Sequence, residues 1–274
     1  MLLWSFAITV TMMVVEIVAG LYTESLALVS DGVHMFTHSF ALGISWGAIV
    51  LATRPASLEK SFGYHRLEVV AAFTNGITVL ASAVWILYEA AVRFFAPREI
   101  QIATTLYVAV AGLIVNIVTG AILMRADQAS LNIKSAFLHM LTDALSSVVI
   151  IVGLIAIHYT GREWIDPLLA VAVAFVIVKW SWHLLGDSLH ILLEGSPVDV
   201  NQVRAHVLQN YPGIIDVHDI HVWQISQRFN CLTAHLLIQP DAISGYPDLI
   251  ERLSADLRAH FEIGHTNFQP EWIN

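Results

Sequence analysis

The sequence is short of charged residues. Of its 274 residues, only 13% are Asp, Glu, Lys or Arg, whereas 57% are hydrophobic. Soluble globular domains carry about 25% charged residues and roughly 45–50% apolar ones. This composition excludes an ordinary soluble domain and predicts an integral membrane protein.

Basic residues and cysteine are also scarce. The chain has 13 Lys and Arg against 22 Asp and Glu, so its formal net charge of −9 provides no basic footprint for nucleic acid. The single cysteine, Cys231, excludes an intramolecular disulfide framework. The sequence contains neither the H-E-x-x-H motif of zinc proteases nor the C-x-x-C-H motif of haem attachment. We therefore expect no nucleic-acid partner and no enzymatic activity.

Long apolar runs dominate the first two thirds of the chain. Six of them reach the roughly 20 residues that a helix needs to cross about 30 Å of hydrocarbon. They cover residues 2–22, 25–53, 66–92, 101–124, 134–158 and 165–190. The first lacks a basic leader and an A-x-A cleavage site, which indicates a helix and not a signal peptide. The basic loop residues favour an inner or plasma membrane protein with both termini in the cytoplasm.

The composition changes near Glu194. From there, residues 195–213 and 244–261 have helical patterns, whereas residues 216–226, 229–239 and 263–272 resemble strands. The order αββαβ predicts a small α+β domain over residues 194–274. It would follow an all-α, six-helix membrane domain over residues 1–193.

Ionisable residues interrupt the second and fifth apolar runs. His34 and His38 stand four residues apart, and Asp31 lies three residues before His34, so the three side chains share one face of a helix. His139 and Asp143 repeat the four-residue spacing on the fifth run. An Asp at the centre of a membrane helix costs about 2.5–3.5 kcal/mol, so these residues indicate a function.

Two helices with such pairs can converge on one four-coordinate centre. Three imidazoles and one carboxylate suit Zn²⁺ or a similar divalent transition metal. We therefore expect His34, His38, His139 and Asp143 to form a metal or proton site, with Asp31 as an accessory acid. Further polar residues of the apolar runs either line a pathway or join helices by hydrogen bonds, and the sequence leaves both open. These residues are Glu16, Asn75, Glu89 and Asn116.

The stretches that carry these residues resemble the cation diffusion facilitator family of metal transporters. The similar stretches are SLALVSDGVHMFTH, RPASLEKSFGYHRLEVVAAFTNG, HMLTDALSS and IDPLLAVAVAFVIV in the membrane domain, and VHDIHVW and LTAHLLI after it. The resemblance covers nearly the whole chain. It implies a six-helix transporter with a ferredoxin-like cytoplasmic domain, which dimerises and exports a divalent metal in exchange for protons.

One candidate ligand departs from the family pattern. Zinc-type members read H-x-x-x-D on both the second and the fifth span, so His34, His139 and Asp143 match, whereas His38 stands where the family has Asp. A nitrogen-rich ligand set favours Zn²⁺, Co²⁺ or Ni²⁺ over Mn²⁺ and Mg²⁺. We therefore expect Zn²⁺, with Co²⁺ or Ni²⁺ as alternatives.

Histidines outside the spans suggest further ligands. His65, at the expected cytoplasmic start of the third span, is a candidate ligand on the path into the membrane or a solvated loop residue. The resemblance implies a cytoplasmic metal site made by His218, His235 and Glu271, with His265 as a further candidate. A structural ion there would stabilise the dimer. The alternative is that these histidines are ordinary exposed residues that bind no metal.

Two other functions compete with transport. A haem protein needs two histidines facing each other across the cofactor, and Asp143 beside His139 fits that poorly. A metal sensor or an uncoupled cation channel would use the same ligands, and only flux measurements separate it from an antiporter.

Overall fold

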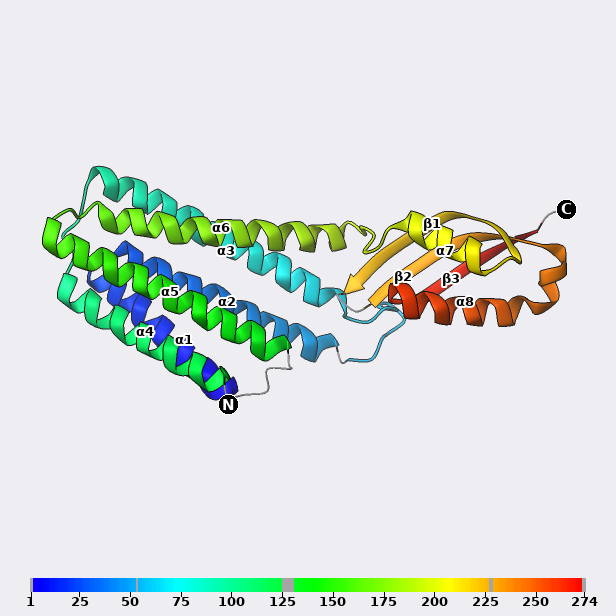
Figure 1. Ribbon diagram of the computed structural model, residues 1–274, viewed down its shortest axis with the longest axis horizontal. Coiled ribbons are helices and arrows are strands. Elements are labelled where there is room, and N and C mark those ends of the chain that lie inside the picture. The colour runs from blue at the N-terminus through cyan, green and yellow to red at the C-terminus, as the bar shows by residue number, and fades with distance from the viewer. Residues whose placement is uncertain (1, 53, 125–130, 227–228, 273–274) are drawn as a thin grey trace. The chain divides into compact units, whose positions relative to one another are not determined.

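The computed structural model describes residues 2–52, 54–124, 131–226 and 229–272 (Figure 1). Its first helices occupy the apolar segments expected from the sequence. They are α1 (Leu2–Tyr22), α2 (Leu26–Ala52), α3 (Arg66–Phe95), α4 (Ile102–Met124), α5 (Leu131–Thr160) and α6 (Ile165–Leu192). Among the described residues, four helical stretches are long and apolar enough to cross a membrane, namely Arg66–Phe95, Ile102–Ile122, Asp143–Thr160 and Ile165–Leu192. Helix α1 adds a shorter apolar stretch, Phe6–Tyr22.

The chain divides into two compact units. The first comprises residues 1–44 and 74–184, and the second comprises residues 45–73 and 185–274. The second unit thus includes the link between α2 and α3 together with the C-terminal domain. The domain boundary at residue 193 that the composition suggests stays a prediction.

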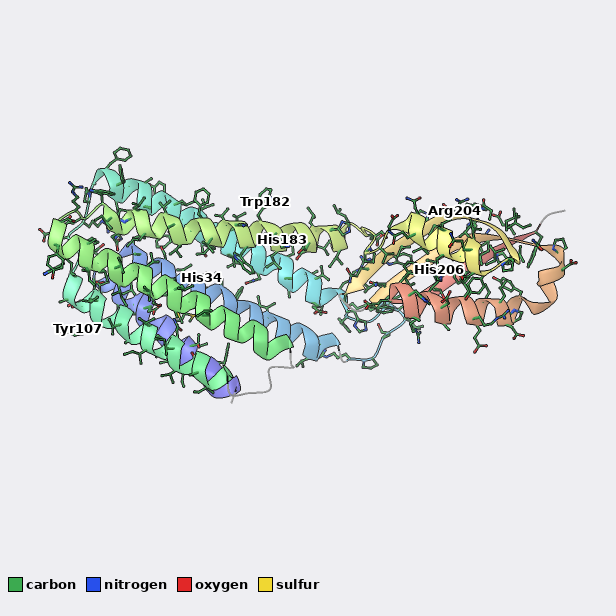
Figure 2. The ribbon with its side chains drawn as sticks, in the orientation of Figure 1. His34, Tyr107, Trp182, His183, Arg204 and His206 are labelled. Carbon is green, nitrogen blue, oxygen red and sulfur yellow. The ribbon has the colours of Figure 1, made fainter. Side chains whose placement is uncertain are left out.

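The first unit exposes apolar side chains and buries polar ones. Phe175 of α6 is 69% exposed. Trp182, at 72% exposure, stands on the outside of the same helix (Figure 2). Glu16, Asp31 and Asp143 are at most 2% exposed. Water would favour the opposite arrangement, whereas lipid favours an apolar exterior around polar groups that face the interior of the bundle.

A carboxylate from α6 holds the start of α2. Asp166 accepts hydrogen bonds from the Ser25 hydroxyl at 2.7 Å and from the backbone N–H groups of Leu26 at 2.7 Å and Ala27 at 3.3 Å. The first N–H groups of a helix have no partner within the helix, and their partial positive charge favours an anion. Asp166 therefore caps α2, the helix that carries Asp31 and His34.

The C-terminal domain has the predicted order αββαβ. Its elements are α7 (Val200–Asn210), β1 (Ile214–Ser226), β2 (Phe229–Ile238), the 3₁₀ helix η1 (Pro240–Gly245), α8 (Tyr246–Phe261) and β3 (Ile263–Trp272). The strand order is β1-β2-β3, with β1 antiparallel and β3 parallel to β2. Asp199 caps α7, because its carboxylate accepts the N–H of Asn201 at 2.9 Å.

Both helices of this domain pack on one face of the sheet. Val203 and Val207 of α7 and Leu253 and Leu257 of α8 share a core with the even-numbered residues of β2 (Leu232, Ala234, Leu236 and Ile238). Successive side chains of a strand point to opposite faces. The odd-numbered residues of β2, including His235, therefore lie on the face away from the helices.

Candidate metal sites

Asp31 and His34 of α2 are buried and contact side chains of α5 in the membrane unit. Asp31 of α2 accepts a hydrogen bond from the Ser146 hydroxyl of α5 at 2.6 Å. One helical turn later, His34 Nε2 lies 3.6 Å from Asp143 Oδ1 (Figure 2 shows His34). The i, i+3 spacing places Asp31 and His34 on the face of α2 that meets α5.

The separation of His34 from Asp143 suits two ligands of one metal ion. Zn²⁺ bonds of about 2.0–2.1 Å in a tetrahedron set neighbouring ligand atoms about 3.3 Å apart. The observed 3.6 Å is close to that value, and the side chains of His34 and Asp143 are 11% and 1% exposed. The side chains of His38 and His139 lie outside the described part of the structure, so both stay predictions.

A further acid is buried in the same unit. Glu16 of α1 is 0% exposed, and neither of its carboxylate oxygens has a hydrogen-bond partner among the described residues. It lies against Gly112 of α4, where a Cβ atom would meet the carboxylate. The sequence presents Glu16 only as an isolated polar residue, because no spacing motif connects it to Asp31 or Asp143.

The contacts of Glu89 favour a role in joining segments over a role in a pathway, the two alternatives that the sequence leaves open for this residue. Glu89 forms an ion pair with Arg93 at 3.0 Å and another with Arg98 at 3.6 Å. It therefore ties the end of α3 to the following loop. Asn75 and Asn116 are buried, at 5% and 1% exposure, and a pathway and a packing role both stay open for them.

The C-terminal domain gathers three of the four candidate ligands that the resemblance implies. His218 of β1 pairs with His235 of β2 across the antiparallel ladder. Glu271 of β3 lies 3.3 Å from His218 Nε2 and 2.8 Å from His235 Nδ1. One ligand atom from each of the three residues lies within 4.8 Å of the others, so these residues could hold a metal ion.

Two aspartates of β1 lie next to this cluster, and the sequence analysis missed both. Asp219 Oδ2 is 3.5 Å from His235 Nε2, and Asp216 Oδ2 is 3.9 Å from His218 Nδ1. Asp219 reaches this position because β1 bulges there, with a positive φ of 48°. A hydrogen bond from Arg204 at 2.6 Å holds the pKa of Asp216 below its ordinary value.

Two other histidines from the sequence analysis lie in aromatic surroundings. His265 pairs in register with Cys231, four residues along β2 from His235, which corresponds to about 13 Å. Its ring contacts Phe62 and Phe229, with ring centroids 5.6 and 6.3 Å apart. His65 stacks edge-on against Phe229 at 5.4 Å. The structure therefore does not bring His265 or His65 into the cluster of His218, His235 and Glu271.

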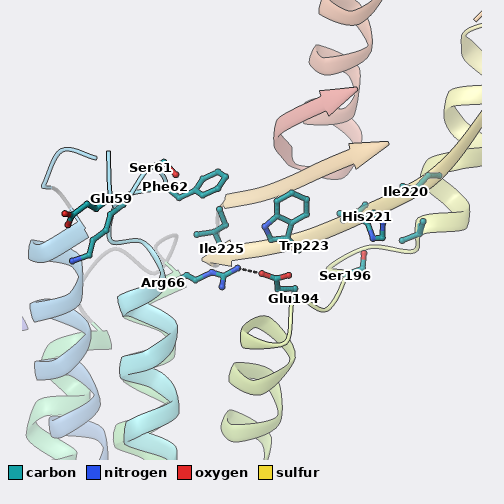
Figure 3. A pocket seen from close by; sticks show the side chains of 14 residues that line it. Glu59, Ser61, Phe62, Arg66, Glu194, Ser196, Ile220, His221, Trp223 and Ile225 are labelled. Carbon is teal, nitrogen blue, oxygen red and sulfur yellow. Dashed lines mark hydrogen bonds and ion pairs between the residues drawn. The ribbon is translucent and has the colours of Figure 1, made fainter. Parts of the chain in front are cut away.

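A groove of about 770 Å³ lies in the second unit (Figure 3). Its lining comes from the link before α3, the segment after α6 and the middle of β1. Arg66 and Glu194 form an ion pair of 2.8 Å within it. The groove contains neither His218 nor His235, so it is separate from the candidate ligands of the sheet.

Comparison with known proteins identifies the family. The model of the cation efflux transmembrane domain matches residues 2–193, and that of the cytoplasmic domain of cation efflux proteins matches residues 196–272. The chain belongs to the cation diffusion facilitators. This membership, together with the four apolar helices, makes it an integral membrane protein.

Named relatives resemble this facilitator over almost its whole length. The cation efflux system protein CzcD of Alcaligenes sp. (strain CT14) is 38% identical over 97% of the chain and 84% of its own length. The zinc transporter ZitB of Yersinia pestis is 36% identical over 99% of the chain and 87% of its own. The cadmium, cobalt and zinc/H(+)-K(+) antiporter of Bacillus subtilis (strain 168) is 34% identical over 98% of the chain and 88% of its own.

Proposed function

We propose that this facilitator exports a divalent transition metal from the cytoplasm in exchange for protons. Zn²⁺ is the foremost substrate, with Co²⁺ and Ni²⁺ as alternatives. The names of the relatives support this proposal, since they include a cation efflux protein, a zinc transporter and an antiporter. In this proposal all six long helices span an inner or plasma membrane, both termini are cytoplasmic, and the C-terminal domain is ferredoxin-like and dimerises.

The pair of His34 and Asp143 carries the proposal. Both side chains are buried in the membrane unit, on different helices, with 3.6 Å between Nε2 and Oδ1. Burying an ionisable pair in a membrane protein is expensive unless it serves a substrate or proton pathway. His38 and His139 complete the proposed site, because each lies four residues from one member of the pair on the same helix.

The proposed ligand set also suggests how metal and protons exchange. Imidazole must lose its proton to bind a metal, so protons compete with the metal for the same nitrogens. A side of the membrane rich in protons therefore favours metal release. Three neutral imidazoles and one carboxylate leave one net positive charge on bound Zn²⁺. Asp31, which Ser146 anchors at 2.6 Å, is the nearby acid proposed to compensate for it.

The cytoplasmic cluster has a different proposed role. A structural metal ion on His218, His235 and Glu271 would join all three strands of the sheet on the face that the helices leave open. Such an ion stabilises the domain and, where this face meets a second copy, the dimer. Among the described residues, the contacts of the His65 and His265 side chains are with aromatic rings, so the proposed site does not depend on these histidines.

The test of transport is Zn²⁺ flux in proteoliposomes, with and without a pH gradient. We expect the flux of the wild type to respond to the gradient. Asp143→Asn should lose flux at least about tenfold, because it removes the one charged ligand of the proposed site, and a loss of about 1.4 kcal/mol in metal binding already corresponds to a factor of ten. His158→Gln, an exposed histidine near the end of α5, is the matched control and should keep its flux. Flux that ignores the gradient would indicate a channel, and binding without flux would indicate a sensor.

Metal choice is tested separately at position 38. We expect His38→Asp, which restores the family residue, to shift the preference among Zn²⁺, Co²⁺ and Mn²⁺ toward Mn²⁺, because oxygen ligands suit harder ions. Unchanged preference and rate would show that position 38 is not a ligand.

A further inference from the structure

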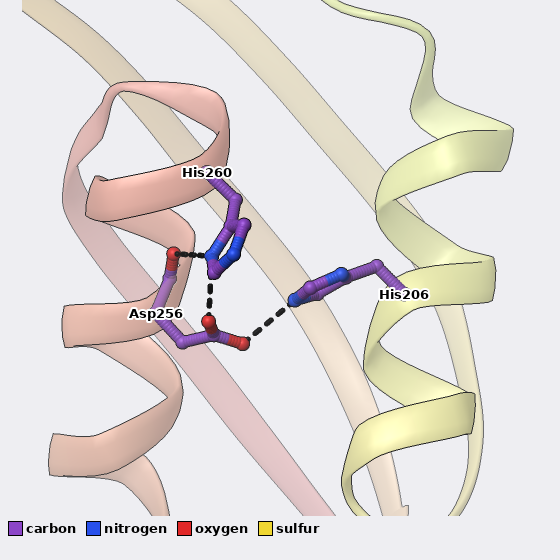
Figure 4. A group of neighbouring side chains, drawn as sticks. All are labelled: His206, Asp256 and His260. Atoms are coloured by element: carbon purple, nitrogen blue, oxygen red, sulfur yellow. Dashed lines mark hydrogen bonds and ion pairs between the residues drawn. The ribbon is translucent and has the colours of Figure 1, made fainter.

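A third group of potential metal ligands lies between the two helices of the C-terminal domain. It consists of His206 on α7 and of Asp256 and His260 on α8 (Figure 4). His206 Nε2 lies 2.7 Å from Asp256 Oδ2, and His260 Nδ1 lies 2.7 Å from Asp256 Oδ1. Both imidazoles therefore converge on one carboxylate, and one ligand atom from each residue lies within 4.8 Å of the others.

We propose that His206, Asp256 and His260 bind a divalent transition metal, Zn²⁺ first, and that this ion joins α7 to α8. Two nitrogens and one carboxylate oxygen form a ligand set typical of zinc, with water in the fourth position. The site is separate from the cluster of the sheet, because its ligands come from the helical layer, whereas His235 points to the opposite face. It also differs from the proposed transport site, which lies in the other unit.

The geometry needs only a small adjustment to accept an ion. Ligand atoms of a tetrahedral zinc site stand about 3.3 Å apart, so the two hydrogen-bonded contacts must open by about 0.6 Å. His260 can make this movement because its side chain is 59% exposed. His206 and Asp256 are 22% and 21% exposed, which leaves them within reach of ions from solution while helix packing holds their positions.

The surroundings of the cluster favour a cation. His206 lies in the last part of α7, which ends at Asn210, and Asp256 and His260 lie near the end of α8 at Phe261. Carbonyl groups without partners give the carboxyl end of a helix a partial negative charge. Among the described residues, the ion pairs of Asp256 involve only the two histidines, so no Lys or Arg in this part of the chain neutralises it through such a pair.

Neighbouring polar groups hold the ligands in place. The Tyr211 hydroxyl lies 3.2 Å from Asp256 Oδ2, and the Asn210 side-chain nitrogen lies 3.4 Å from His206 Nδ1. Binding through His206 Nε2 requires the tautomer with its proton on Nδ1. Rotation of the Asn210 amide, which gives up its hydrogen bond to the His206 carbonyl at 2.9 Å, would present the amide oxygen to that proton. Such second contacts orient metal-bound histidines in many sites.

The experiment counts zinc bound to the purified full-length protein in detergent. Each variant is loaded with Zn²⁺, separated from loosely held metal by gel filtration, and analysed for zinc per chain. We expect His260→Gln and the double variant His206→Gln/His260→Gln each to hold one ion fewer than the wild type. Glu251→Gln removes an exposed acid from α8 outside the cluster and should bind as much zinc as the wild type.

Equal zinc content in the wild type and both variants would overturn the proposal. Circular dichroism checks that the variants fold. If the double variant fails to fold, His260→Gln alone decides the question, because the His260 side chain is mostly exposed and its replacement should not disturb the fold. A stability measurement adds an independent readout. Zn²⁺ should raise the thermal midpoint of the wild type more than that of His260→Gln, because a ligand that binds only the folded state stabilises it. An equal increase in both proteins would also contradict the proposal.

Discussion

Replacing Asp166 by alanine should destabilise the membrane unit strongly. The carboxylate accepts three hydrogen bonds, from the Ser25 hydroxyl and from the N–H groups of Leu26 and Ala27, and it is 1% exposed. A buried donor left without its acceptor costs about 1–3 kcal/mol. Three such donors give a loss of at least about 3 kcal/mol. Asp166→Asn keeps one acceptor oxygen but loses the charge, so it should fall between alanine and the wild type.

Thermal unfolding of the full-length protein in detergent measures this effect. A loss of 1 kcal/mol lowers the midpoint by roughly 2–4 °C in a protein of about 150–250 residues, so we expect a decrease of roughly 6–12 °C for Asp166→Ala. Zinc flux should fall with it, because Asp166 sets the start of the helix that carries His34. Fraying of the first turn of α2 would appear as faster hydrogen exchange at Leu26 and Ala27.

Glu99→Ala, which removes an exposed acid from a loop, is the matched control and should leave the midpoint unchanged within about 1–2 °C. A midpoint of Asp166→Ala equal to that of the control would refute the reasoning. It would show that water or lipid headgroups replace the carboxylate at the start of α2.

Three further substitutions test other parts of the structure. Gly112→Ala places a Cβ against the Glu16 carboxylate, which lies at the end of a flexible side chain and must move, so the loss should be about 1 kcal/mol, the low end of the overpacking range. Adding Glu16→Ala should relieve most of this loss, and a double-mutant cycle without coupling would contradict the contact. Asp216→Asn should destabilise by less than about 1 kcal/mol at neutral pH, because Arg204 and Asp216 are 49% and 37% exposed. The folded pKa of Asp216 is lowered, so its contribution exists above the unfolded pKa of about 3.9 and disappears as the pH falls through the folded value. Unfolding curves recorded between neutral and acid pH should therefore converge for the two proteins, and a constant difference would argue against the ion pair.

Local patterns of the sequence account for most of the elements. An apolar run forms a helix wherever lipid or a packed core can cover it, so the expected segment 2–22 coincides with α1 and 165–190 with most of α6. The αββαβ order followed from alternation and helical periodicity alone. The spacing of Asp31 and His34 likewise indicated a shared face of α2, because an i, i+3 interval has a local geometric meaning.

Contacts between distant segments could not be predicted in this way. Asp166 caps α2 at Leu26, which lies 140 residues earlier in the chain, and Glu16 contacts Gly112, 96 residues later. No spacing rule relates positions so far apart in the sequence. His206 and Asp256 are 50 residues apart, although the four-residue interval of Asp256 and His260 offered a partial signal. The position of the candidate ligand His265 could not be predicted from spacing either, since the register of β3 places it beside Cys231 and the aromatic rings.

The amino-acid pattern alone predicts a membrane protein with a small α+β domain and with His and Asp at helical spacing in two apolar runs. Composition and periodicity suffice for that, because burial in lipid or in a core acts on each segment separately. Only the tertiary structure decided which carboxylate meets which imidazole, that a bulge turns Asp219 toward His235, and that two helices bring His206 to Asp256. These pairings depend on strand register and helix packing, which are properties of the whole fold.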